Sequence, residues 1–253
     1  NLTNVIIQLP FANLLVKAAE FIVPGTDADE MEASKYLDVR IIETPTIALG
    51  QVNKEVVRMG EMVLGNLKDS EAVFIDEKYD KIDGILEKEQ IINKIEREIT
   101  DYLIKLSNAP LTKVQHLHVN NLFNTINDIE RVGDHIENIA ELAQNKIANN
   151  LSFSGIAADE LRIMFNKCEE VFEKTMIAFK DKDKEAANLV NILEDEVDSL
   201  EAQNRENHIY RLNTSQCVTP SGILFLDCIS NLERVSDHSL NISQYVLKEL
   251  NAE

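Results

Sequence analysis

One short sequence pattern occurs twice in this chain of 253 residues, and it limits the possible folds more than any other feature. The stretch DIERVGDHIENIAE occupies residues 128–141, and NLERVSDHSLNISQ occupies residues 231–244, which is 103 positions later. Residues 129–139 and 232–242 are identical at seven of eleven places. Two unrelated windows of that length would share about one identity at ordinary residue frequencies. The chain is therefore predicted to contain a duplicated unit and to fold as two similar halves.

The rest of the sequence has the pattern of long helices. Tryptophan is absent and glycine and proline are scarce, while apolar residues recur at helical spacing from Pro45 almost to the end. No segment alternates as a strand would. The predicted fold class is all-α, with two tandem, pseudo-symmetric three-helix bundles at 45–150 and 151–253. Their helices are predicted at 46–68, 71–107, 114–149, 156–180, 184–212 and 218–251.

The first 44 residues have no counterpart in the repeat. Residues 1–25 form an apolar but interrupted segment, which falls short of the roughly 20 mostly apolar residues of a free-standing membrane span. This segment is predicted to be the end of a membrane region or a membrane-proximal helix, followed by an acidic linker at 26–44. Its apolar stripe is predicted to contact a membrane or a partner, most simply a second copy in a homodimer. The stripe consists of Phe11, Leu14, Ala18 and Phe21.

Composition and motifs exclude several functional classes. The formal net charge of -19 argues against nucleic-acid binding, which depends on clustered Lys and Arg. The three cysteines form no Cys-x-x-Cys pair, which favours a reduced environment and a packing role. No Gly-rich phosphate loop or nucleophile elbow occurs, and no histidine follows a glutamate by three residues as in di-iron bundles. The chain is predicted not to be an enzyme. Because it begins without methionine, it is also predicted to be part of a longer protein.

The duplicated segments place oxygen-bearing side chains in rows along the helices, which we call the acidic ladders. At about 100° per residue, Glu130, Asp134 and Asn138 lie beside the apolar stripe of their helix. Glu233, Asp237 and Asn241 repeat this geometry in the second copy. The helices before them contain a second matching pair, EQIINKIE and EDEVDSLE, whose ladders lie on the same rotational side. These ladders are Glu89, Asn93 and Glu96 in the first half, and Glu194, Asp198 and Glu201 in the second.

Ladders that converge would gather four or five oxygen atoms in each half. Such hard ligands suit iron, manganese, magnesium or calcium, and a cation between them would relieve the repulsion of like charges. Chance is the alternative, because the chain has 44 acidic residues and Arg131 and Arg234 could pair with neighbouring carboxylates. His135 and His238 recur as well, and they are predicted to pack locally or to form hydrogen bonds with a neighbour.

The repeated elements ERVGDHIENIAE and ERVSDHSLNIS resemble the PhoU family of phosphate-transport regulators. Members of that family have two three-helix repeats with Glu/Asp-x-x-x-Asp motifs that can hold iron or other metals. The resemblance covers about residues 45–251 and implies that the motif carboxylates are Glu130, Asp134, Glu233 and Asp237. The copies differ at Gly133 and Ser236, and Asn93 in the first copy corresponds to Asp198 in the second. This difference weakens the case for a metal in the first repeat.

The region before the repeats resembles the junction in bacterial sodium-dependent phosphate cotransporters between the last membrane segment and a cytoplasmic PhoU-like domain. This implies a regulatory domain of a sodium/phosphate symporter, located at the cytoplasmic face of the bacterial cell membrane. Its expected partners are the upstream transporter membrane domain and the inner membrane. Two alternatives stay open, namely a stand-alone PhoU-type regulator of phosphate signalling and a ligand-free helical docking domain.

Overall fold

The computed structural model describes residues 34–252, and this range contains six long helices and no strand. Two short 3-10 helices, η3 (Val39–Ile41) and η4 (Tyr79–Lys81), precede α3 and α4. The prediction of an all-α fold built from two three-helix bundles is confirmed. The predicted apolar N-terminal helix, with Phe11, Leu14, Ala18 and Phe21, lies outside the described residues. The long helices are α3 (Pro45–Phe74), α4 (Ile82–Ser107), α5 (Lys113–Ala148), α6 (Gly155–Asp181), α7 (Lys184–Asn213) and α8 (Thr219–Leu250).

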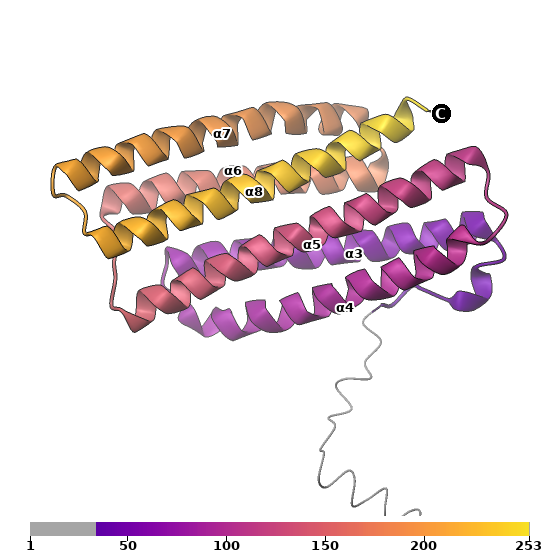
Figure 1. Cartoon of the computed structure of the whole chain (residues 1–253), viewed down its shortest axis with the longest axis horizontal. Helices are drawn as coiled ribbons and strands as arrows, with labels where there is room; N and C mark the ends of the chain where they lie inside the picture. Colours follow the sequence, from indigo (N-terminus) through magenta and orange to yellow (C-terminus); the bar gives the residue numbers. More distant parts are fainter. Residues whose placement is uncertain (1–33, 253) are drawn as a thin grey trace, which may run out of the picture. The chain divides into compact units, whose positions relative to one another are not determined.

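The two bundles pack side by side (Figure 1). Helices α3, α4 and α5 contact one another, as do α6, α7 and α8, and the bundles meet through α5 against α8 and α3 against α6. Each helix buries one apolar stripe, for example Ile92, Ile95 and Ile99 on α4. Each fully buried side chain of this size contributes roughly 1.5–3 kcal/mol. Burial of the repeated stripes is therefore the main force that holds both bundles together.

Two predicted helix boundaries are wrong, the end of the first helix at residue 68 and the start of the second at residue 71, since α4 begins at Ile82. The sequence predicts a helix end at residue 68, but α3 continues to Phe74, and the turn to α4 occupies residues 75–81. Val73 and Phe74 are fully buried, so the extra turn adds apolar contacts to the core. The buried Lys146 of α5 donates a hydrogen bond to the Phe74 carbonyl at 3.1 Å and thereby satisfies a carbonyl at the helix end.

A reciprocal pair of hydrogen bonds joins α5 and α8 at the bundle interface. His135 Nδ1 lies 2.9 Å from Asn231 Oδ1, and His238 Nδ1 lies 2.7 Å from Asp128 Oδ1. The two imidazole rings stack, with their centroids 5.6 Å apart. Both histidines therefore form hydrogen bonds with a neighbouring helix, and the pseudo-twofold relation of the repeats extends to these contacts.

The end of the predicted linker is held firmly against the first bundle. The fully buried carboxylate of Glu55 accepts hydrogen bonds from the backbone N–H groups of Lys35 and Tyr36, each at 2.9 Å. Glu55 also forms an ion pair with Arg58. The Tyr102 hydroxyl donates to the Asp38 carbonyl at 3.0 Å. Residues 34–38 are thus anchored before α3 begins.

Replacing Glu55 with glutamine should lower the free energy of unfolding by about 2 kcal/mol. The amide nitrogen of glutamine would face the N–H donors that the carboxylate accepts from, and the half-buried Arg58 would lose the ion pair with Glu55. Urea denaturation measures the effect, with Glu43→Gln as the control because Glu43 is exposed. Equal stability of the two variants would show that the anchor contributes little.

Candidate metal centres

The acidic ladders of α7 and α8 converge in the second bundle. Carboxylate oxygens of Glu194 and Asp198 on α7 and of Asp237 on α8 all lie within 4.8 Å of one another. Glu194 is buried, whereas Asp198 is exposed, so the cluster lies at the edge of the core and opens to solvent. This is the arrangement that the shared rotational side of the ladders predicts. Metal binding to these residues stays a prediction.

Like charges dominate this second cluster. Burial raises the pKa of Glu194 to about 7, and the carboxylates of Asp198 and Asp237 reinforce the shift. Burial and the charge of Asp237 also raise the pKa of Glu233, against the opposing effect of Arg234. A cation placed among these oxygens would reverse the shifts, because it favours the ionised carboxylates.

The remaining predicted ligand of the second half, Glu201, lies beside this cluster. Its charge contributes to the raised pKa values of Asp198 and Glu233. Glu201 also forms an ion pair with Arg205 one turn further along α7. It is therefore close enough to influence a cation but already has a partner.

The first bundle buries its central carboxylate more deeply. Only 1% of Glu89 is exposed, and neither of its side-chain oxygens has a hydrogen-bond partner within residues 34–252. The same holds for Asn93 Oδ1 and Glu130 Oε2. Burial raises the pKa of Glu89 to about 8, and the charges of Asp134, Glu137 and Glu130 add to the effect. Buried polar atoms normally have partners, so this cluster is suited to a proton or a cation.

Gly133 explains why Glu89 can occupy this position. A Cβ atom at residue 133 would lie 2.5 Å from Glu89 Oε2, so the glycine allows the carboxyl group to pack against α5. The corresponding residue in the second copy is Ser236, whose buried hydroxyl has no hydrogen-bond partner in the described part of the chain. The glycine-to-serine difference therefore marks a real difference between the two clusters, with a deeper carboxylate in the first.

Arginines flank the ladders in both halves. Arg131 Nη1 lies 3.2 Å from Asp134 Oδ2, and Arg234 Nη1 lies 3.2 Å from Asp237 Oδ2. The ion pairs that the chance alternative anticipates are therefore present. Both arginines are more than half exposed, and exposed pairs of this kind contribute little to stability. They do not prevent a cation from competing for the aspartates.

Not every ladder residue joins its cluster. Asn138 donates a hydrogen bond to Asn231 and Asn241 donates one to Asp128, each at 3.3 Å, so both amides belong to the α5–α8 interface. Glu96 accepts a hydrogen bond from Thr100 and affects the pKa of Glu130. Glu137, which the ladder pattern omits, lies close enough to raise the pKa of Glu89.

The fold and the clusters define an all-helical protein made of two repeats, each with carboxylates gathered between its second and third helices. The model of the PhoU domain matches residues 56–143 and 161–246, which are more than half of the chain and include both clusters. The chain belongs to the PhoU family.

Known proteins with similar sequences and structures act in phosphate transport. The chain is 27% identical to a phosphate-specific transport system accessory protein PhoU homolog of Xylella fastidiosa, over 84% of this chain and 89% of that protein. The phosphate transport system regulatory protein PhoU from Streptococcus pneumoniae has the same fold, with a TM-score of 0.74 at 20% identity over 83% of this chain and 98% of that one. A third match is the "Putative inorganic phosphate export protein YjbB" of Salmonella typhimurium, 22% identical over 98% of this chain but only 46% of that protein.

The predicted location at the cytoplasmic face of the cell membrane, as part of an integral membrane protein, is wrong. The relative from Xylella fastidiosa, which the chain matches over most of both lengths, is a PhoU homologue. Within residues 34–252, no helix is both long enough and apolar enough to cross a membrane. The physical reason is that most large apolar side chains of these helices face the bundle cores, while charged residues interrupt every long apolar run.

Proposed function

We propose that this chain regulates phosphate transport and that its two acidic clusters are divalent-metal sites that control its interaction with a partner. One observation carries the proposal: the second match to the PhoU domain includes three carboxylates within 4.8 Å of one another, and the first includes the buried Glu89, whose pKa is raised by burial and neighbouring carboxylates. The relative from Xylella fastidiosa, a phosphate-specific transport accessory protein, supports the phosphate-related role.

The chemistry of the donors determines how such a site would work. In the second bundle, Glu194, Asp198, Asp237 and the neighbouring Glu233 would hold a hard cation such as iron, manganese, magnesium or calcium. In the first bundle, Glu89, Glu130 and Asp134 would do so. A bound cation would neutralise repelling charges on two neighbouring helices. It would thereby stabilise their packing and change the charge of the surface that a partner meets.

Phosphate uptake tests this function. In a bacterial strain that lacks its own PhoU homologue, expression of the chain should change the rate of labelled phosphate uptake. The double variant Asp198→Asn/Asp237→Asn should lose that effect, because it removes two charges from the second cluster. Glu206→Gln is the control, since Glu206 is an exposed acidic residue of α7, the helix that contains Asp198. Uptake equal to that of the empty strain, with the wild-type protein accumulating normally, would refute the proposal.

A second candidate is that the chain is the regulatory part of a longer phosphate-transport protein. The match to YjbB favours it, because that match extends over 98% of this chain yet under half of the larger protein. The relatives named above refer to phosphate and not to sodium, so these matches give no support to the narrower role in a sodium/phosphate symporter.

A further inference from the structure

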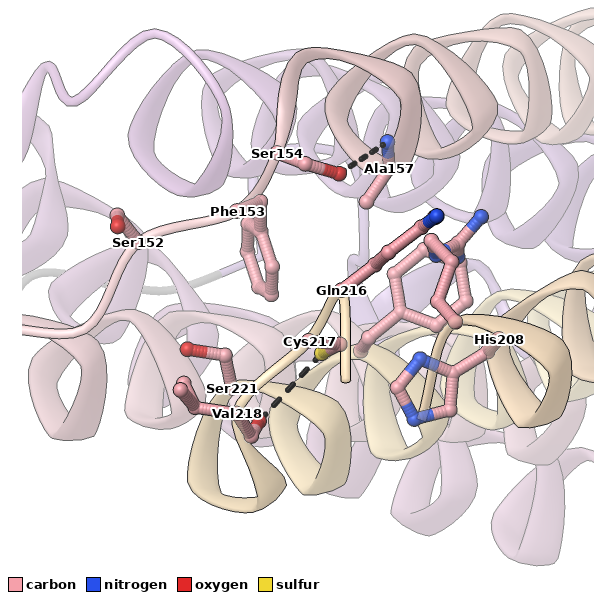
Figure 2. Close-up of a pocket in the computed structure, with 11 residues that line it drawn as sticks. Ser152, Phe153, Ser154, Ala157, His208, Gln216, Cys217, Val218 and Ser221 are labelled. Atoms are coloured by element: carbon pink, nitrogen blue, oxygen red, sulfur yellow. Dashed lines mark hydrogen bonds between the residues drawn. The ribbon is translucent and has the colours of Figure 1, made fainter. Parts of the chain in front are cut away.

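A cavity of about 250 Å³ lies at one end of the second bundle, away from the acidic clusters. Figure 2 shows it between the α5–α6 connection, which contributes Phe153 and Ser154, and the α7–α8 connection, which contributes Gln216 and Cys217. Helices α7 and α8 complete its wall with polar and aromatic side chains. These are His208, Arg211, Ser221 and Phe225.

Several polar groups of this wall have unused hydrogen-bonding capacity. Ser221 is 2% exposed and His208 is 1% exposed, yet Ser221 Oγ and His208 Nε2 have no hydrogen-bond partner among the described residues. Arg211 forms an ion pair with Glu160 at 2.7 Å, and Glu160 does not line the cavity. A guanidinium group has five N–H donors, so one carboxylate does not use all of them.

The start of α8 adds the backbone N–H groups of Thr219 and Ser221 at the same place, since Pro220 between them has none. Its N-cap residue, Val218, lines the cavity and has no side-chain oxygen to accept from the first-turn N–H groups. The positive end of the helix dipole therefore faces a region that already contains a guanidinium and a hydroxyl group. An acceptor with several oxygens would satisfy these donors together.

The internal duplication allows the cavity to be compared with the equivalent end of the first bundle. At the equivalent end of the first bundle, His118 occupies the position of Ser221, 103 residues earlier. The imidazole of His118 lies between Glu249 at 2.9 Å and Asn53 at 3.1 Å, and two smaller cavities of about 10 and 120 Å³ adjoin it. In one half the histidine is paired within the chain and adjoins smaller cavities, whereas the other half has a serine beside a cavity of about 250 Å³.

Charge is reversed between the two ends as well. The residue equivalent to Glu249 in the first repeat is Lys146, again 103 positions earlier. Lys146 Nζ lies 5.2 Å from the centroid of the Phe153 ring, which lines the cavity. Where the first bundle end has the carboxylate of Glu249, the cavity end has the ammonium group of Lys146, which forms an ion pair with Glu77 at 3.1 Å. The carboxylates that pair with Lys146 and Arg211 are those of Glu77 and Glu160, and neither of them lines the cavity.

We propose that this cavity binds a small oxyanion with the chemistry of a phosphoryl group, held by Arg211, Ser221 and the first turn of α8. The proposal rests on the proposed function only for the choice of phosphate as the probe. The geometry of the cavity is independent of the acidic clusters, so either site can fail without the other.

Calorimetric titration of the full chain with inorganic phosphate, in buffer that contains a chelator, tests the proposal. We expect saturable binding at one site per chain, and Ser221→Ala should weaken it about tenfold by removing one hydrogen bond to a charged ligand. Ser221→Ala removes a hydroxyl without a partner in the described structure, so it should not destabilise the fold. Ser236→Ala is the matched control, because Ser236 Oγ is equally buried and unpartnered within residues 34–252 but lies outside the cavity.

Two further arms make the result decisive. Arg211→Lys keeps the charge but loses the planar fork, and it should also weaken binding about tenfold while thermal unfolding shows a folded protein. O-phosphoserine distinguishes the source of the ligand, since binding of this ester without binding of free phosphate would indicate a phosphorylated molecule.

The proposal is overturned if the folded wild-type chain binds neither compound. It is also overturned if Ser221→Ala and Arg211→Lys bind as tightly as Ser236→Ala. A normal effect on phosphate uptake together with absent binding would overturn the cavity proposal alone.

Discussion

Replacing Glu89 with glutamine should make the metal-free protein more stable than the wild type at pH 7, by about 3 kcal/mol. Burial and the facing carboxylates of Asp134, Glu137 and Glu130 raise the pKa of Glu89 from its usual 4.5 to about 8. The folded protein therefore keeps a proton that the unfolded chain releases above about pH 4.5. Glutamine has the shape of the protonated acid and does not titrate, so the cost of protonating or burying this carboxylate disappears.

The sign of the pH dependence follows from the same shift. Between about pH 4.5 and pH 8 the folded state binds more protons than the unfolded state, so wild-type stability should fall as pH rises through this range. Urea unfolding at several pH values, in chelator, measures the slope. The slope should be smaller for Glu89→Gln and unchanged for Glu87→Gln, because Glu87 is an exposed residue of the same helix. Parallel curves for wild type and Glu89→Gln would show that Glu89 is ionised in the folded state.

The helical fold could be predicted because its information is local and repeated. Apolar stripes at helical spacing and two copies of one motif determine the helices and their pairing, and each expected helix is present within residues 34–252. The end of α3 could not be predicted, because it depends on a tertiary contact. Residues 68–74 contain no glycine or proline that would end a helix, so the sequence does not mark the boundary. The hydrogen bond from Lys146 to the Phe74 carbonyl, which lies at the observed end, comes from a distant segment.

The candidate metal clusters were predictable only in part. Rotation about a helix axis indicates which side a ladder faces, and the structure brings Glu194, Asp198 and Asp237 together on that basis. The angular position of a residue on its own helix does not reveal which side chains of the other bundle form hydrogen bonds with it. Asn138 and Asn241 therefore bond across the α5–α8 interface instead of extending the ladders.

The cavity could not be predicted from the sequence, because its wall includes two interhelical connections whose packing has no periodic signal. The substitution of His118 by Ser221 between the copies is visible in the sequence. Its meaning depends on knowing that His118 pairs with Glu249 and Asn53, and only the structure supplies that knowledge.

Divalent cations should strongly increase the free energy of unfolding of the wild-type chain. Replacing the carboxylates of the second cluster should abolish part of this increase. A cation that binds only the folded state adds about 2.7 kcal/mol when its concentration is one hundred times the Kd. Asp198→Asn/Asp237→Asn should lose this stabilisation for the second site, since it leaves Glu194 as the only charged member of the three convergent carboxylates. Thermal unfolding with and without manganese, together with elemental analysis of protein purified without chelator, measures both the gain and the metal content.

The metal binding of the two clusters can be distinguished by comparing this double variant with the variant Glu89→Gln/Asp134→Asn in the first cluster. Each variant should retain the metal of the other bundle, because the clusters belong to different helix pairs. The first cluster should bind more weakly, since Asn93 offers a neutral amide oxygen where the second copy has Asp198 and since Glu89 must lose a proton before it can ligate. Its affinity should therefore rise with pH up to about 8, whereas the affinity of the second cluster should level off near pH 7, where Glu194 ionises. Unchanged metal content in both double variants would show that the ladders are not ligands and that their convergence serves another purpose.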